Sequence, residues 1–152
     1  MQVEIDQSGK IEWTQKPTVL ALSNDMRLSM LIAATEKRKI LLALRQRKPR
    51  WSRTFINVSV FSTLLYLLLK DHIGKLSLIV IDPEYQGHEP MIKDRVMTLC
   101  RKQGIRVHGE QLTFQRVGKK SPAHDLAIKV FRGKVSPDRE ISAKEVLAEF
   151  GQ

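Results

Sequence analysis

Two acidic residues in this chain each follow a short run that is typical of a β-strand. Asp6 follows Val3-Glu-Ile5, in which apolar and polar residues alternate, and Asp82 follows the apolar run Leu78-Ile-Val-Ile81. If the two strands are parallel neighbours, both carboxylates lie at the edge of the sheet where open α/β folds bind ligands. Carboxylate oxygens are the ligands that hard divalent cations prefer. Either aspartate could instead shape the turn after its strand, because Asp hydrogen-bonds its own backbone.

The elements that would position these acids follow from the spacing of apolar and turn residues. Strands are predicted at 2–6, 18–23, 28–34, 76–81 and 112–114, with a further short strand piece at 105–107. Helices are predicted at 54–71, 89–103, 123–131 and 137–150. The segment before the long helix is interrupted by Lys48-Pro49-Arg50. This order predicts one α/β domain over residues 1–152, with a mixed five-stranded sheet flanked by helices.

Three short motifs in this order resemble those of the ribonuclease H-like superfamily. They are Val3-Glu-Ile-Asp6-Gln-Ser8-Gly9, then Leu78-Ile-Val-Ile-Asp82-Pro-Glu84-Tyr85, and finally Val117-Gly-Lys-Lys-Ser-Pro-Ala-His124-Asp125. In that superfamily, acids at the ends of the first and fourth strands share divalent metals. The resemblance implies a metal-dependent nuclease, or a related phosphodiester-processing protein, that uses Mg²⁺ or Mn²⁺.

The resemblance also assigns roles to individual residues. Asp6 and Asp82 would be the central metal ligands, Asp125 would complete the metal shell, and His124 would assist proton transfer. The superfamily usually supplies a further acid from its first long helix, but residues 53–69 contain none and offer only Asn57. Glu84 is the substitute ligand that the sequence suggests. Asp125 and His124 have a simpler interpretation as polar residues at a helix start, where the helix dipole favours an acid.

The charge of the chain points to a polyanionic partner. It carries 26 Lys and Arg against 16 Asp and Glu, a formal charge of +10. Residues 37–53 contain no acid, and Trp51 there could combine base stacking with phosphate contact. The predicted nucleic-acid contacts are Lys37, Arg38, Arg45, Arg47, Lys48, Arg50, Arg116, Lys119 and Lys120. Residues 37–53 could instead be a solvated loop. For the whole protein, the alternatives to a nuclease are a catalytically degenerate nucleic-acid-binding module and a basic subunit of a larger assembly.

Several other classes of protein fit the sequence poorly. The single cysteine, Cys100, excludes an internal disulfide framework and a cysteine-based zinc cluster. The most apolar stretch, 55–69, is shorter than the roughly 20 residues of a membrane span, so no membrane partner is expected. Gly118-Lys-Lys-Ser lacks the glycine spacing of a P-loop, so no nucleotide cofactor is expected. With no signal-like start, the chain is expected in the cytoplasm.

Overall fold

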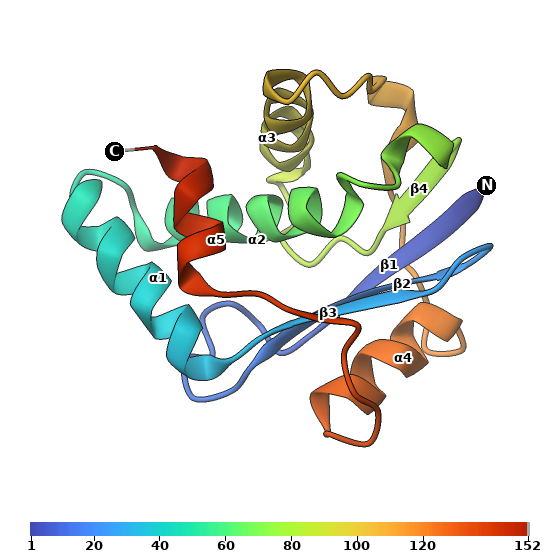
Figure 1. The fold of residues 1–152 in the computed structure, drawn as a ribbon, viewed down its shortest axis with the longest axis horizontal. Coiled ribbons are helices and arrows are strands. Elements are labelled where there is room, and N and C mark those ends of the chain that lie inside the picture. The colour runs from blue at the N-terminus through green and yellow to red at the C-terminus, as the bar shows by residue number, and fades with distance from the viewer. Residues whose placement is uncertain (152) are drawn as a thin grey trace.

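The computed structural model describes residues 1–151 and has the α/β architecture that the sequence predicts (Figure 1). The strands are β1 Gln2–Ser8, β2 Thr18–Asn24, β3 Leu28–Ile32, β4 Leu78–Ile81, β5 Leu112–Phe114 and β6 Arg139–Glu140. The helices are α1 Ala34–Arg47, α2 Arg53–Leu69, α3 Glu89–Lys102, α4 Pro122–Phe131 and α5 Ala143–Leu147. Three single turns of 3₁₀ helix lie at Ile73–Lys75, Gly109–Gln111 and Ala148–Phe150.

The strands form one mixed sheet in the order β5-β4-β1-β2-β3-β6. Strands β1, β2 and β3 are antiparallel neighbours, whereas β4 is parallel to both β1 and β5. In the β1–β4 pair, Ile5 lies opposite Ile81. The prediction that the two acid-ended strands are parallel neighbours is therefore confirmed.

The sheet has six strands within the described residues, not the predicted five, and the last predicted helix starts later than predicted because a strand precedes it. The chain at Arg139–Glu140 pairs with β3 instead of coiling, and Asp138 Oδ2 accepts a 2.8 Å hydrogen bond from Ser29 N. Helix α5 begins only after Ser142, whose side chain accepts from Glu145 N while Glu145 bonds back to Ser142. The strand piece predicted at 105–107 is also absent, because β5 forms only at Leu112–Phe114.

Most of the basic stretch is helical. Residues 37–47 of this stretch belong to helix α1, and the helix ends at Lys48-Pro-Arg50 as predicted. Helix α2 begins after Ser52, whose hydroxyl accepts from Phe55 N at 3.0 Å. Thirteen of the 17 residues of α2 are buried, which matches the predicted helix surrounded by protein.

The helices cover the two faces of the sheet unequally (Figure 1). Helices α1, α2, α3 and α5 lie on one side, and α4 lies alone on the other. Alternation along β2 follows this division, because Leu20 and Leu22 join the large core while Val19 and Ala21 pack with α4.

A glycine turns the chain out of β1. Gly9 has a φ of +82°, and a Cβ atom there would lie 2.1 Å from the carbonyl oxygen of Pro17 and 2.6 Å from the Phe131 ring. Only glycine fits this position, because both the backbone conformation and the close approach exclude a side chain. The turn starts the segment 9–17, which we call the β1–β2 loop.

Among the described residues, no helix combines the length and the apolar character needed to cross a membrane.

Candidate metal centre

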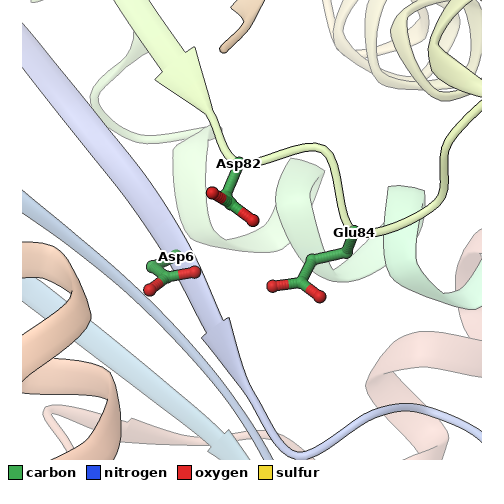
Figure 2. Close-up of side chains that lie close together, drawn as sticks. All are labelled: Asp6, Asp82 and Glu84. Atoms are coloured by element: carbon green, nitrogen blue, oxygen red, sulfur yellow. The ribbon is translucent and has the colours of Figure 1, made fainter. Parts of the chain in front are cut away.

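Three carboxylates meet where β4 ends beside β1. Asp6, Asp82 and Glu84 each offer an oxygen that lies within 4.8 Å of the others, and Figure 2 shows the three side chains converging. The register of the sheet explains two of them: Asp82 N donates to Ile5 O at 3.1 Å, which continues the β1–β4 pairing by one residue. Strand alternation then sends both aspartates to the face of the sheet that carries α4.

Asp6 is held from two sides. Its Oδ1 accepts from Gln7 N at 2.9 Å, and its Oδ2 lies 2.6 Å from His124 Nδ1 at the start of α4. The side chain of Asp6 is only 7% exposed, so these contacts fix it in a largely buried position. His124 keeps its other ring nitrogen, Nε2, free of hydrogen bonds from the described residues.

Asp82 and Glu84 are positioned by the chain around them. Asp82 Oδ1 accepts from Val117 N at 2.8 Å, which ties the segment after β5 to the site. A tight turn brings Glu84 back, because Glu84 N donates to Asp82 O at 2.9 Å. Asp82 Oδ2 and the Glu84 carboxylate have no N–H donor among the described residues, and the hydrogen bond that raises the pKa of Glu84 is one with Asp82 itself. These oxygens are therefore available to a cation.

The three carboxylates resist being charged together. Burial raises the pKa of Asp6, and the nearby charge of Asp82 adds to this effect. Burial likewise raises the pKa of Glu84 to about 7, with further repulsion from Asp82 and Asp6, although Lys10 opposes the shift. A divalent cation among them would offset this repulsion, so the electrostatics fit a metal site.

Basic side chains surround the acids. The carboxylates open into a pocket of about 180 Å³ whose lining also includes Arg116, Lys119 and His124. Arg116 and Lys119 are exposed and come from the segment after β5, as the sequence predicts. Lys120 is exposed beside them. Acids that suit a cation and bases that suit phosphate thus face the same space.

The start of α4 is fastened to β1 by two contacts. Ser121 caps the helix by accepting from Ala123 N, and its hydroxyl donates to Glu4 Oε1 at 2.9 Å. Further along the same strand, His124 contacts Asp6. Glu4 and Asp6 lie on the same face of β1, so these two contacts fix the position of the helix start relative to the strand.

Asp125, a predicted ligand, lies elsewhere, and so does Asn57, the polar residue of the long helix. Asp125 pairs with Lys129 at 2.9 Å, and its side chain is 62% exposed. Neighbouring helical residues point about 100° apart, so the turn that directs His124 to Asp6 directs Asp125 away. Asn57 lines a separate hollow beside Arg45 and Arg53.

One predicted nucleic-acid contact is wrong, because Lys37 is buried. Its Nζ donates to Lys10 O and Thr18 Oγ1, both at 3.0 Å, and the residue is 0% exposed. Burial lowers the pKa of this amine to about 8. The other predicted cations of the stretch are at least partly exposed: Arg38, Arg45, Arg47, Lys48 and Arg50.

Trp51, the predicted stacking residue, is half-buried. Its ring packs edge-on against Phe55 at 4.7 Å and lies 6.3 Å from Phe150, with Lys48 over it. The exposed indole is Trp13, 50% exposed on the β1–β2 loop, which the sequence analysis did not select. Lys10 of the same loop also escaped selection. The available signal was their place in the loop that follows the acid-ended strand.

The site offers three carboxylates, one histidine and a basic rim within one pocket. No protein-family model, curated protein or solved structure matches the chain. Its function is therefore inferred from the geometry of the site itself.

Proposed function

We propose that this protein is a metal-dependent nuclease in which Asp6, Asp82 and Glu84 hold one Mg²⁺ or Mn²⁺ ion. The observation that carries the proposal is the convergence of these three acids within 4.8 Å on a chain with a formal charge of +10. Hard divalent cations take such oxygen ligands, and a strongly basic protein attracts a phosphate backbone.

The arrangement of the chain supports a ribonuclease H-like scaffold as part of the proposal. The first and fourth strands are parallel neighbours, Asp6 lies two residues before the end of β1, Asp82 directly follows β4, and the segment after β5 reaches the same pocket. The resemblance implied each of these features. Two features depart from it: the sixth strand, and the acid of α4 that points outward.

The residues of the pocket divide the work of phosphodiester hydrolysis. A bound divalent ion supplies charge stabilisation and a more acidic water. Asp6 holds the His124 ring through Nδ1, which leaves Nε2 to exchange a proton with water or a leaving oxygen. Arg116 and Lys119 bind phosphate oxygens at the rim.

The number of carboxylates favours one ion over two. With Asp125 paired to Lys129 and Asn57 in another hollow, three acids serve the site among residues 1–151. Asp6 already accepts a hydrogen bond on each oxygen, which reduces what it can offer a second ion.

Cleavage assays with matched variants test the proposal. Labelled DNA, RNA, RNA–DNA hybrid and a four-way junction are incubated with wild type, Asp6→Asn, Glu84→Gln and the control Asp125→Asn, in Mg²⁺ or Mn²⁺. Wild type and Asp125→Asn should cleave one substrate class in a metal-dependent manner, while Asp6→Asn and Glu84→Gln lose about a hundredfold or more in rate. Cleavage that survives in both site variants contradicts the proposal.

Metal binding gives a second readout that needs no substrate. Mg²⁺ should raise the thermal midpoint of wild type and Asp125→Asn, because an ion that binds only the folded state stabilises it. The increase should shrink or vanish in Asp6→Asn. An equal increase in all proteins would place the ion elsewhere.

The cation excess favours a second candidate, a binding module without catalysis. Such a module would bind nucleic acid with an affinity that falls steeply with salt and does not depend on Asp6. Binding without cleavage, unchanged in Asp6→Asn, supports this candidate over the nuclease.

A further inference from the structure

Two hollows lie along the β1–β2 loop, the segment that follows the strand carrying Asp6. One hollow lies between this loop, α1 and α2; a second, of about 290 Å³, lies between the loop and α1. Both are lined by Thr14, Leu41 and Arg45, so the two hollows adjoin along the loop and α1 and make up one basic depression. We call this depression the arginine groove.

The groove is strongly basic and its basic groups are arginines. Arg38, Arg45 and Arg53 line it, against a single acid, Glu12. Within residues 1–151 none of the three arginines forms an ion pair, and all three are exposed. Arg38 is oriented by a 2.7 Å hydrogen bond from its NH1 to Thr14 O. Planar guanidinium groups bind phosphate in a bidentate manner, so three of them suit successive phosphates.

Exposed apolar side chains come from the same loop and the same helix. Trp13 is 50% exposed and directly precedes Thr14, while Leu42 is 56% exposed and lines the second hollow. The Nζ atom of Lys10 lies 5.7 Å from the centre of the Trp13 ring. The charge of Lys10 also opposes the rise in the pKa of Glu84 in the acidic pocket. A duplex presents mainly phosphates on its outside, whereas a single strand also offers bases that stack on aromatic rings. The combination of arginines with an exposed indole fits the single strand.

We propose that the arginine groove binds single-stranded nucleic acid and leads it to the acidic pocket. Phosphates lie on Arg38, Arg45 and Arg53, and a base stacks on Trp13. This substrate assignment rests on the proposed function, but binding in the groove does not require that the acids cleave.

The other side of α1 provides a matched control. Lys39 and Arg47 point there, where they border a different hollow together with Lys144 of α5. Helical spacing separates this side from the one that carries Arg38 and Arg45. Replacing Lys39 and Lys144 removes as much charge as replacing Arg45 and Arg53 but leaves the groove intact.

Binding of a labelled oligonucleotide of about 15 nucleotides, in EDTA to prevent cleavage, tests the proposal. The double variant Arg45→Ala/Arg53→Ala should bind about tenfold or more weaker, and its dependence of log affinity on log salt should flatten by about 1.4 for two lost phosphate contacts. The double variant Lys39→Ala/Lys144→Ala should stay near wild type. Equal losses in the two double variants would overturn the groove.

Trp13→Ala separates strand types. It should weaken single-strand binding about tenfold and leave duplex binding nearly unchanged, with Trp13→Phe in between. Equal losses for single strand and duplex would overturn the single-strand assignment. Binding is measured in EDTA, where metal-dependent cleavage is absent, so a failure of the groove appears in this assay and a failure of the nuclease proposal appears only in the cleavage assay.

Discussion

One face of the sheet packs against four helices, whereas the other is covered by α4 alone (Figure 1). The first face holds the large core, which includes nearly the whole of α2. The second has a small cluster that is built from Val19, Ala21, Leu126, Ala127 and Val130, with a few half-buried neighbours. All three candidate metal ligands lie beside the end of β4, and both aspartates point to the face that α4 covers alone.

Because of this difference, one face of the sheet supplies most of the folding free energy, while the other leaves the acids accessible to a ligand. Apolar burial is the main source of folding free energy, so the four-helix face supplies most of it. The α4 face buries little and leaves polar strand residues such as Glu4 and Asp6 to meet only the start of one helix. A ligand can therefore reach the strand ends without disturbing the main core.

The largest expected effect comes from the heavily covered face. Phe61 of α2 is 1% exposed, and its ring lies 5.0 Å from that of Tyr85. Phe61→Ala should lower the free energy of unfolding by about 3–5 kcal/mol, measured by urea denaturation. The half-buried Phe131 of α4 serves as the comparison, and Phe131→Ala should cost about 1–2 kcal/mol. Similar costs at the two positions would remove the asymmetry.

The buried amine of Lys37 gives the heavily covered face a dependence on pH. Its folded pKa of about 8 lies below the ordinary value of 10.5, so the unfolded chain binds more protons between these values. The free energy of unfolding of wild type, relative to Lys37→Met, should therefore rise by about 2–3 kcal/mol from pH 8 to pH 10.5. Urea denaturation of both proteins at the two pH values measures it. A constant difference would mean that the amine is not desolvated.

The smallest effect concerns α4. Val130→Ala should lower the free energy of unfolding by about 1 kcal/mol and open α4 locally. Hydrogen exchange measures this, because amides of α4 should exchange through smaller openings than those of α2, and the variant should widen the gap. Uniform exchange across both helices would show that the two faces unfold as one unit.

The sequence predicts the acidic strand ends well because they depend on local patterns. Alternation in β1 and the apolar run of β4 identify both strands, and a parallel pair must bring Asp6 and Asp82 to one edge. Glu84 follows from the turn two residues after Asp82. These inferences need only the strand period and the direction of the chain.

Other features depend on contacts that a local pattern does not contain. Asp125 differs from His124 only in helical phase, which is set by the Ser121 cap and its bond to Glu4. Lys37 has a charged neighbourhood in the sequence, yet it shares the inner face of α1 with Ile40, Leu41 and Leu44. The helical spacing of Lys37 from these apolar residues can be seen in the sequence. The partners of its amine, Lys10 O and Thr18 Oγ1, cannot. Strand β6 requires β3 beside it and has no strand pattern of its own.

Strand β6 also bears on how much of the sheet edge is open to pairing with a second chain. Without it, the five residues of β3 would form an open edge whose free backbone groups could pair with a second chain. Two residues of β6 and the Asp138 side chain occupy part of that edge, and the opposite edge ends in the three-residue β5. Short borders of this kind are poor templates for cross-strand growth. The segment after α4 thus leaves less of the β3 edge open to pairing with another strand.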